Sequence, residues 1–190
     1  MGKLVVTEFV TLDGVMQDPG GGEKDTFDRG GWAFQFDRGP DGDKFKFDEL
    51  QAADAQLLGR VTYDGFAKAW PTMNDNPFGE KMNAMPKFVV SKTIENPEWN
   101  NTTVLSGDLA EEVGKLKEQF ARDILVAGSA QLVQGLIAND LVDQLNLMVF
   151  PVVLGAGKRL FGGTERTKAL ELAETKQAGD TVILVYRRSN

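Results

Sequence analysis

The sequence predicts a three-layer α/β fold whose sheet is mixed, mostly parallel and ends in an antiparallel hairpin. Short apolar runs, typical of strands covered on both faces, alternate with segments whose apolar residues recur every three or four positions. Near the C-terminus, strand-like runs at 170–176 and 181–187 flank the turn signal Ala178-Gly179-Asp180. Alternating strands and helices form such layers. The 190 residues, 42% of them hydrophobic, suit one domain over residues 1–190.

The N-terminal part of the chain combines a strand with a long loop. Residues 4–12 are rich in Val, Thr and Phe and predict the first strand, which ends at the turn Asp13-Gly14. Residues 17–43 are crowded with Gly, Asp and Pro, yet they contain the aromatic side chains Phe27, Trp32, Phe34 and Phe36. These rings either anchor the loop on the core, which is the commoner role, or form a wall on which a flat heterocycle stacks.

A motif at residues 37–48 comes close to a calcium-binding loop. It fails at the third position, which is Gly39, and at the twelfth, where Asp48 stands in place of a bidentate Glu. We therefore interpret the motif as an acidic, solvated loop and expect no metal.

A first strand-to-helix junction follows. The period of the apolar residues predicts a helix at 44–55, and residues 56–59 read as a buried strand. The segment Gly59-Arg60-Val61-Thr62 comes next, with Thr62 placed to cap a short helix toward Trp70. The sequence therefore predicts strand, glycine and helix cap in direct succession.

A second junction of the same kind lies at Gly128-Ser129. It joins an apolar strand at 124–127 to a helix that Ser129 caps and Asn139-Asp140 ends, and a strand at 144–150 follows. Glycine lets a ligand approach the backbone, and the free amides of a helix start carry positive partial charge. The two junctions could hold the two ends of one dinucleotide. Between them, the pattern predicts a strand at 87–91 and a helix at 109–120.

Composition excludes several classes of function. A formal net charge of -7 disfavours nucleic acid and anionic membranes as partners. No apolar segment is long enough to span a bilayer, and Met1-Gly2-Lys3 leads straight into a strand, so we expect a cytoplasmic protein. The sequence contains no cysteine and no histidine, which excludes disulfides, a Ser-His-Asp triad and an ordinary zinc site.

Four groups of residues carry a resemblance to a known family, in order along nearly the whole chain. They are Leu12-Asp13-Gly14; Leu58-Gly59-Arg60-x-Thr62-Tyr63; Met82-Asn83-x-x-Pro86-Lys87-x-Val89-Val90-Ser91-Lys92; and the series Gly128-Ser129-Ala130-x-Leu132, Leu141-Val142-Asp143 and Pro151-Val152-Val153-Leu154-Gly155-x-Gly157-x-x-Leu160-Phe161. In these motifs the chain resembles the reductase (C-terminal) domain of the bifunctional riboflavin-biosynthesis deaminase-reductase, in a stand-alone form. The resemblance implies the dihydrofolate reductase fold. The zinc deaminase of the bifunctional enzyme needs a His or Cys cluster, so we expect no deaminase activity.

The resemblance also implies a function and a set of site residues. It implies an NADPH-dependent reductase, similar to 5-amino-6-(5-phosphoribosylamino)uracil reductase and dihydrofolate reductase, that acts as a homodimer on a pyrimidine-, pteridine- or ribosyl-type small molecule. The implied cofactor-binding residues are Val10, Thr11, Gly59, Arg60, Val61, Thr62, Ser91, Lys92, Gly128, Ser129, Ala130, Gln131 and Leu132. The implied substrate-binding residues are Asp13, Trp32, Leu154, Gly155 and Lys158. The candidate catalytic carboxylates are Asp13, Asp48 and Glu49.

Some alternatives stay open at this point. Arg60 and Lys92 supply positive charge that favours NADPH over NADH, whereas Lys158 is either a phosphate contact or an ordinary surface cation. The helical pattern does not show which of Asp48 and Glu49 faces inward. Ser129 replaces a glycine of the family and Gln144 replaces a frequent acid. The alternative function is therefore a non-catalytic nucleotide-binding homologue of the same fold.

Overall fold

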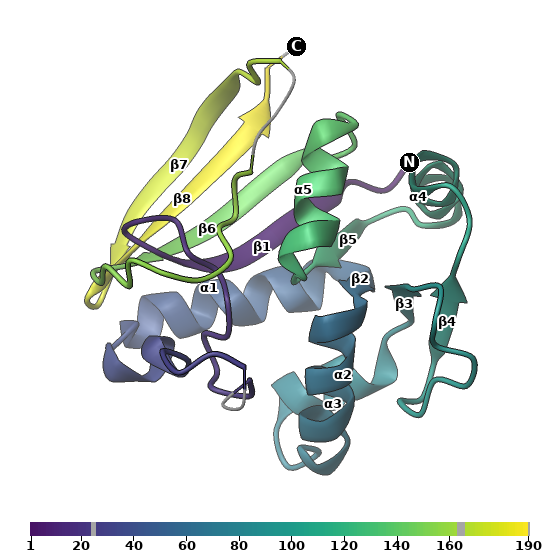
Figure 1. The fold of residues 1–190 in the computed structure, drawn as a ribbon, viewed down its shortest axis with the longest axis horizontal. Coiled ribbons are helices and arrows are strands. Elements are labelled where there is room, and N and C mark those ends of the chain that lie inside the picture. Colours follow the sequence, from purple (N-terminus) through teal and green to yellow (C-terminus); the bar gives the residue numbers. More distant parts are fainter. Residues whose placement is uncertain (24–25, 163–165, 190) are drawn as a thin grey trace.

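The computed structural model describes residues 1–23, 26–162 and 166–189, which form one eight-stranded sheet and its covering helices (Figure 1). The strands are β1 (Leu4–Thr11), β2 (Ala53–Gly59), β3 (Lys87–Val90), β4 (Thr102–Leu105), β5 (Asp123–Val126), β6 (Gln144–Phe150), β7 (Leu170–Ala178) and β8 (Thr181–Arg188). The helices are η1 (Trp32–Gln35), α1 (Gly39–Ala52), α2 (Arg60–Ala69), η2 (Trp70–Thr72), α3 (Pro77–Ala84), α4 (Leu109–Gln119) and α5 (Ala130–Ala138).

The sheet has the order β4-β3-β2-β5-β1-β6-β8-β7. Only β8 is antiparallel to its neighbours β6 and β7, and the other described neighbours pair in parallel. The predicted mostly parallel sheet with a C-terminal antiparallel hairpin is therefore confirmed.

Helices cover both faces of this sheet. In Figure 1, α5 lies in front of the sheet and α1 lies behind it. On the first face, α4 and α5 pack into one core cluster through Val113 and Leu136. On the other face, α1, α2 and α3 pack into a second cluster through Leu50, Tyr63 and Met82. Burial of these apolar faces stabilises the three layers, at about 25 cal/mol per Å² of apolar area.

The central strand β1 is longer than one of its neighbours. It pairs with β6 from Val5 to Thr11, but with β5 only from Leu4 to Val6. Because β5 ends at Val126, the edge of β1 beyond Val6 has no described strand beside it. Open sheets bind ligands where neighbouring strands diverge at their carboxyl ends. The early end of β5 therefore leaves one side of β1 without a strand partner in the middle of the sheet.

The acidic motif at 37–48 is not the solvated loop that we predicted. Helix α1 begins at Gly39 instead of residue 44, and it ends at Ala52, so that β2 begins at Ala53 instead of residue 56. Pro40 and Asp41 explain the early start, because proline suits the first helical turn and an acidic side chain there interacts favourably with the helix dipole. Because glycines are typical of loops, the sequence pattern did not predict that the helix begins within this motif.

The predicted cap of α2 is also wrong. Helix α2 begins at Arg60 with Gly59 as its N-cap, so Thr62 lies inside the first turn. The helix therefore starts immediately after the last residue of β2. Ser129 is the N-cap of α5, as predicted, although its side chain makes no capping hydrogen bond.

Candidate functional site

The two strand-to-helix junctions lie against each other. The main-chain N–H of Gly59 donates to the carbonyl oxygen of Gly128 at 2.9 Å. A Cβ atom on Gly59 would lie 2.2 Å from Oγ of Ser129, and one on Gly128 would lie 2.6 Å from Oγ1 of Thr62. Gly128 has φ of 82°, a conformation that favours glycine, and the Gly128–Ser129 peptide bond is cis. Glycine at both positions therefore allows the starts of α2 and α5 to converge.

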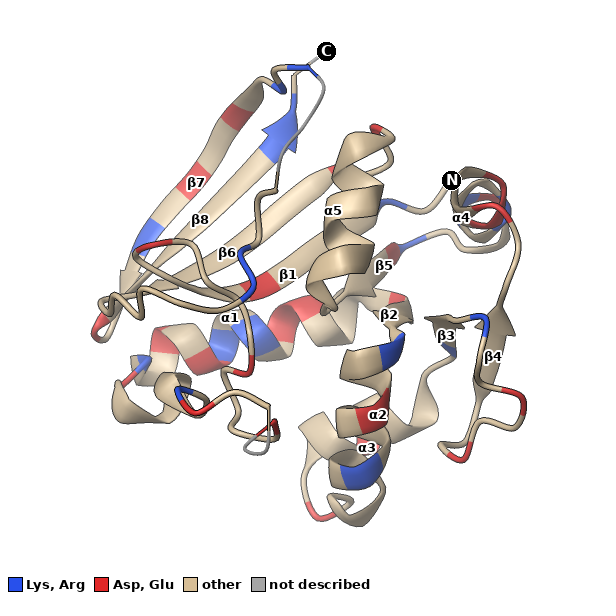
Figure 2. Cartoon of the chain, in the orientation of Figure 1, with Lys and Arg blue, Asp and Glu red and all other residues tan. Residues whose placement is uncertain are grey.

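The converging helix starts leave backbone donors without side-chain caps. Neither Gly59 nor Ser129 gives a capping hydrogen bond, and neither α2 nor α5 has an acidic residue in its first turn. In Figure 2, α5 carries no charged residue along its whole length. By contrast, Asn76 caps α3 and Asp108 caps α4 through their side chains. Uncapped helix starts attract anions such as phosphate.

Two cations and a hydroxyl lie near this edge of the sheet. Arg60 begins α2 and forms an ion pair with Asp64 at 2.7 Å, with about half of the Arg60 side chain exposed (51%). Lys92 is exposed just after β3. The hydroxyl of Ser91 accepts hydrogen bonds from the amides of Thr93 and Ile94. Ser91 therefore shapes the turn that presents Lys92.

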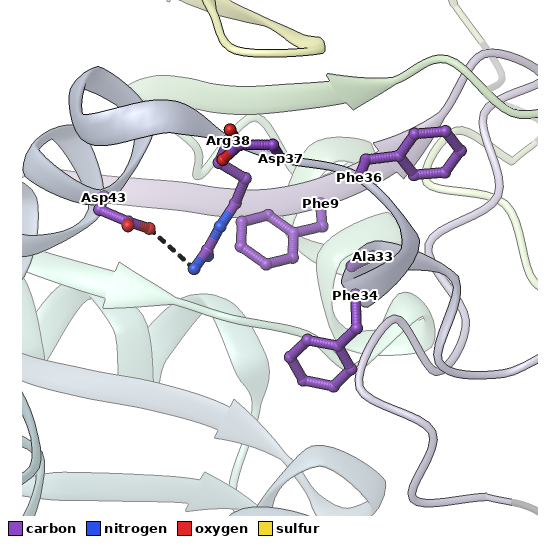
Figure 3. A pocket seen from close by; sticks show the side chains of 7 residues that line it. All are labelled: Phe9, Ala33, Phe34, Phe36, Asp37, Arg38 and Asp43. Carbon is purple, nitrogen blue, oxygen red and sulfur yellow. Dashed lines mark ion pairs between the residues drawn. The ribbon is translucent and has the colours of Figure 1, made fainter.

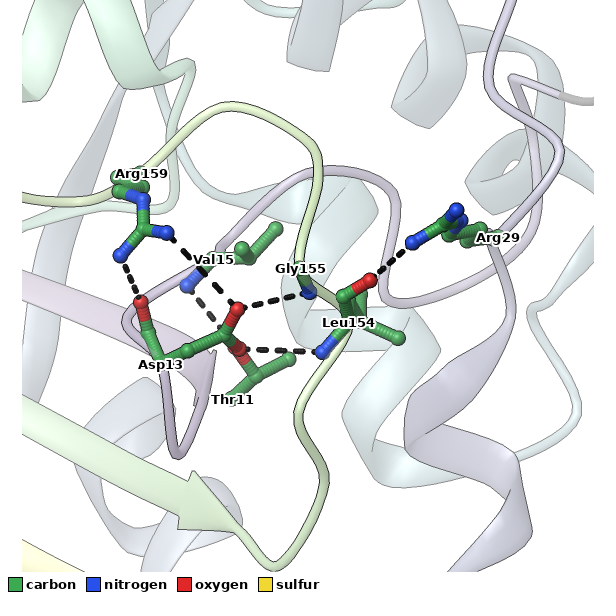
Figure 4. Close-up of polar contacts among 7 residues, drawn as sticks. All are labelled: Thr11, Asp13, Val15, Arg29, Leu154, Gly155 and Arg159. Atoms are coloured by element: carbon green, nitrogen blue, oxygen red, sulfur yellow. Dashed lines mark hydrogen bonds and ion pairs between the residues drawn. The ribbon is translucent and has the colours of Figure 1, made fainter.

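The side chain of Asp13 hydrogen-bonds to the loop at residues 154–155 and so holds this loop beside the end of β1 (Figure 4). Its carboxylate accepts hydrogen bonds from the hydroxyl of Thr11 at 2.6 Å and from the amides of Leu154 and Gly155 at 3.2 and 2.9 Å. The Thr11 hydroxyl and these amides lower the pKa of Asp13 to about 2. Arg159 donates to its carbonyl oxygen at 2.6 Å. Asp13 is therefore ionised at neutral pH and holds the 154–155 loop in place.

The structure brings Asp13, Leu154 and Gly155, three of the predicted substrate-binding residues, together with Thr11, a predicted cofactor-binding residue. Lys158 belongs to the same loop, but its side chain is exposed and its main-chain amide donates to Gln17 at 3.0 Å. Both roles predicted for Lys158, phosphate contact and surface cation, are compatible with this exposure.

The structure separates the two neighbouring acids of α1. Asp48 is exposed and pairs with Lys44, away from the sheet. Glu49 faces inward, with a side chain that is 8% exposed and ion-paired with Lys46. It accepts hydrogen bonds from the Thr7 hydroxyl at 2.6 Å and from the Asn146 amide at 3.0 Å. Of the two acids, only Glu49 belongs to the buried polar cluster between α1 and the sheet.

Gln144, which stands where the family often has an acid, extends this cluster. Its side-chain amide donates to the side-chain oxygen Oδ1 of Asn146 at 2.8 Å, and the Asn146 side-chain amide in turn donates to the Glu49 carboxylate. The amide therefore connects to the carboxylate through one intermediate. An acid at position 144 would have no hydrogen to donate to Asn146 in this way.

A pocket of about 170 Å³ opens beside this cluster. Figure 3 shows the aromatic rings that line it, with Arg38 lying over the ring of Phe9 at 5.4 Å and paired with Asp43 at 2.8 Å. Phe34 lines it too and is 79% exposed. Lys46, from the Glu49 cluster, lies 5.2 Å from the centre of the Phe9 ring. Phe9 therefore separates the pocket from the buried acid.

The structure places Trp32 in the core and not in the wall of this pocket. Trp32 is 1% exposed, its ring edge packs against Phe150, and its Nε1 donates to the carbonyl oxygen of Gln17. This is the loop-anchoring role. The exposed ring of Phe34 lines the pocket, as the alternative role of stacking on a flat heterocycle requires. Phe9, which also lines the pocket, was not among the candidates from the sequence.

Sequence reasoning also missed Glu8, in the middle of β1. This residue is 8% exposed, and its Oε1 has no hydrogen-bond partner among the described residues. Burial raises the pKa of Glu8 to about 8, against the effects of Lys46 and of a hydrogen bond from the Gly128 amide, which lower it. An acidic residue within the otherwise apolar run of a central strand was the available signal.

Two further observations concern metal sites and membrane-spanning helices. Within residues 1–23, 26–162 and 166–189, no three His, Cys, Asp or Glu side chains are grouped so that they could hold a metal ion. In the same ranges, the helices are too short or too polar to cross a membrane.

The fold and the paired junctions first define a class, that of α/β proteins with the dihydrofolate reductase fold. A dihydrofolate reductase from Enterococcus faecalis, complexed with NADP(H), superposes with a TM-score of 0.58 at 14% identity over 99% of this chain and 97% of its own. The chain itself belongs to the RibD C-terminal domain family, whose model matches residues 2–184.

The chain is also similar to a curated relative and to further solved structures. The uncharacterized protein YyaP of Bacillus subtilis (strain 168) is 31% identical, over 97% of this chain and 94% of its own length. A putative riboflavin biosynthesis protein from Shewanella sp. PV-4 has a TM-score of 0.76 at 20% identity, with 99% of both chains covered. Acinetobacter baumannii RibD has a TM-score of 0.67 at 16% identity, and the match covers all of this chain but 59% of the RibD chain.

Proposed function

We propose that the protein is an NADPH-dependent reductase that transfers hydride to a pyrimidine-, pteridine- or ribosyl-type small molecule. The observation that carries this proposal is the convergence of two uncapped helix starts beside the open edge of β1. The E. faecalis dihydrofolate reductase of similar fold is complexed with NADP(H), and RibD contains the same domain. A nicotinamide supplies the hydride when bound, so the protein needs only to orient the cofactor and the substrate, shield them from water and supply a proton.

The residues of the two junctions fit such a cofactor. The amides at 59–62 and 128–132 would bind its phosphates, with Arg60 and Lys92 as neutralising cations. Beyond Val6, β1 has no strand partner on the β5 side, and its main chain there offers donors and acceptors for a carboxamide as far as Thr11, whose own N–H and C=O are paired with Val15 and Gly14.

The substrate would occupy the neighbouring aromatic pocket. Phe9 and Phe34 offer faces on which a flat heterocycle can stack, and Arg38 adds a cation beside them. The inward carboxylate of Glu49 lies behind Phe9, where it holds Thr7, Lys46 and Asn146 in place. Asp13 keeps the 154–155 loop over the end of β1.

Titration with NADPH and NADH tests the cofactor assignment, and Arg60 makes the test specific. If Arg60 binds the 2′-phosphate, Arg60→Ala should weaken NADPH binding by about 1.5–3 kcal/mol, roughly 10- to 150-fold, and leave NADH binding nearly unchanged. The matched control is Lys68→Ala, which removes an exposed cation from the last turn of the same helix.

Other outcomes of this titration have distinct meanings. Equal losses for NADPH and NADH would place Arg60 on the shared pyrophosphate. No loss for either would leave Arg60 with only its ion pair to Asp64, which contributes at most about 1 kcal/mol to stability. Wild-type protein that binds neither cofactor at millimolar concentration would contradict the proposed function.

One observation favours the second candidate, a nucleotide-binding homologue without catalysis. Oγ of Ser129 projects into the space between the junctions, 2.2 Å from where a Gly59 Cβ would lie. This side chain narrows the place in which a phosphate would meet α5. Cofactor binding without reduction of dihydrofolate or of 5-amino-6-(5-phosphoribosylamino)uracil would support this candidate.

We also propose that the protein forms a homodimer through the C-terminal hairpin. Strand β7 ends the sheet, and its first eight residues, Leu170–Gln177, are exposed. Leu170 and Leu172 are 40% and 50% exposed there, and Val182 of β8 is 40% exposed. Long exposed edge strands are normally covered in stable proteins.

Light scattering at micromolar concentration should give about twice the monomer mass of 20.8 kDa. Leu172→Lys should shift the protein toward monomer, because a charge on the edge opposes strand pairing. Met73→Lys, at another exposed apolar residue, is the control. A wild-type mass equal to that of one chain would contradict the dimer.

A further inference from the structure

A second pocket, of about 370 Å³, lies at the end of the sheet where β1 and β6 begin, whereas the paired junctions lie where β2 and β5 end. We call it the basic pocket, and it is lined by Lys3, Asp143, Gln144, Glu171, Arg187 and Arg188. A strand rises about 3.3 Å per residue, so the Cα atoms of Lys3 and Phe9 are roughly 20 Å apart. The basic pocket is therefore separate from the aromatic pocket that Phe9 lines.

Positive charge gathers at this pocket, although the chain as a whole has a formal net charge of -7. Figure 2 shows that β8 ends in basic residues. The three cations of the lining, all exposed, are Lys3, Arg187 and Arg188. Of the two acids, Asp143 is already neutralised by Lys117, which lies 2.6 Å away and is not part of the lining. The local excess of positive charge attracts anions.

Gln144 orients the guanidinium of Arg187 in this pocket. Because the Gln144 side-chain amide donates to Asn146, its Oε1 faces Arg187 and accepts from Nε of that residue at 3.4 Å. The two terminal nitrogens of the Arg187 guanidinium have no hydrogen-bond partner within residues 1–23, 26–162 and 166–189. A guanidinium with free N–H groups can bind two oxygens of a phosphate or carboxylate at once.

We propose that the basic pocket binds a small anion with at least two charged oxygens, such as a phosphate monoester or a dicarboxylate. The free N–H groups of Arg187 would bind the charged oxygens, and the ammonium of Lys3 would add to the attraction. Pockets that hold small organic molecules commonly measure about 300–1,000 Å³, so 370 Å³ leaves room for an organic part as well. This site is additional to the cofactor and substrate sites of the proposed function and does not depend on them.

Titration of ¹⁵N-labelled protein with orthophosphate, at neutral pH and constant ionic strength, tests the site by NMR. Orthophosphate can also meet the helix starts of α2 and α5, so the measurement must locate the response. The signals of the Gln144 amide and of Nε of Arg187 should shift as phosphate is added. Arg187→Gln should weaken binding at this pocket by about 10- to 150-fold, the range for a charge-assisted hydrogen bond, and leave NADPH binding unchanged.

Three further variants test the charges separately. Gln144→Glu should also weaken phosphate binding, because the new carboxylate would pair with Arg187 and repel the anion. Glu171, opposite Arg187 in the pairing of β7 with β8, competes with the anion, so Glu171→Gln should strengthen binding by up to about fivefold. The matched control is Lys44→Gln, which removes an exposed cation of α1 and should bind phosphate like the wild type.

A parallel titration with malonate separates the two kinds of anion. A response to orthophosphate alone would indicate a phosphate monoester, and a response to malonate alone would indicate a dicarboxylate. No response at Gln144 and Arg187 to either anion, or the same affinity in Arg187→Gln as in wild type, would overturn the inference. If Arg187→Gln instead changed the mass in light scattering and left phosphate binding intact, the cations would belong to a subunit contact, which also overturns it. Failure of the wild type to bind NADPH would contradict only the proposed function.

Discussion

Replacing Lys87 with alanine is expected to lower the free energy of unfolding by about 3–5 kcal/mol, the largest stability effect that we predict. Lys87, on β3, is fully buried. Its ammonium group donates to the carbonyl oxygens of Met82, Asn83 and Met85 at 3.1, 2.9 and 2.8 Å. The ring of Trp99 lies 4.3 Å from the same nitrogen. Alanine would leave three acceptors at the end of α3 without this donor and would open a cavity under Trp99.

Urea denaturation measures this loss, and two further variants separate its parts. Lys87→Met keeps the volume of the stem, so it should recover the packing contribution but not the hydrogen bonds. Lys115→Ala, which removes an exposed lysine paired with Glu112 at 3.3 Å, should cost at most about 1 kcal/mol. If Lys87→Ala cost no more than Lys115→Ala, the end of α3 would not depend on the buried ammonium group.

The second large effect is expected at Gly59. In Gly59→Ala, the new methyl group would lie 2.2 Å from Oγ of Ser129 and 2.7 Å from its main-chain nitrogen. The backbone at the start of α5 must therefore move away from α2. We expect a loss of about 1–3 kcal/mol in stability from this overpacking. NADPH affinity should fall more than about tenfold, because the amides of the two helix starts no longer converge.

The matched control is Gly65, which lies on α2, the helix that follows Gly59. Gly65 has open space around its would-be Cβ, so Gly65→Ala should stabilise the protein by about 0.5–1 kcal/mol and leave NADPH binding intact. Adding Ser129→Gly to Gly59→Ala removes the hydroxyl but not the main-chain nitrogen, so it should not restore binding. Calorimetry and cofactor titration on these three variants and the wild type measure both effects. Full binding by Gly59→Ala would show that the close contact of the junctions is not needed.

Most of the order of strands and helices could be predicted because it depends on local patterns, although the sequence analysis did not predict α3 (Pro77–Ala84). The hairpin needed only two strand-like runs around Gly179, and α5 needed only an apolar period that begins after Ser129. The start of α1 could not be predicted in this way. Its glycines resemble a loop, and the proline and acid that begin the helix stand among them.

The candidate site depends on long-range contacts that no local pattern contains. Glu49 faces inward because Thr7 and Asn146, from two distant strands, meet its carboxylate. Glu8 is a buried acid on a stretch of β1 without a β5 partner only because β5 stops at Val126. Trp32 became part of the core because Phe150 lies beneath it. In each case the residue type is compatible with several roles, and tertiary packing decides which role the side chain has.

The short ladder between β1 and β5 also has a mechanical consequence. Three residue pairs, Leu4–Val6 with Ile124–Val126, join β4-β3-β2-β5 to β1-β6-β8-β7, whereas β1 and β6 share seven. The sheet is thus two groups of four strands, joined by the shortest ladder between any two of its neighbouring strands. A molecule bound across this ladder would contact both groups and would restrict any motion between them, and the entropy lost in this way would reduce its affinity.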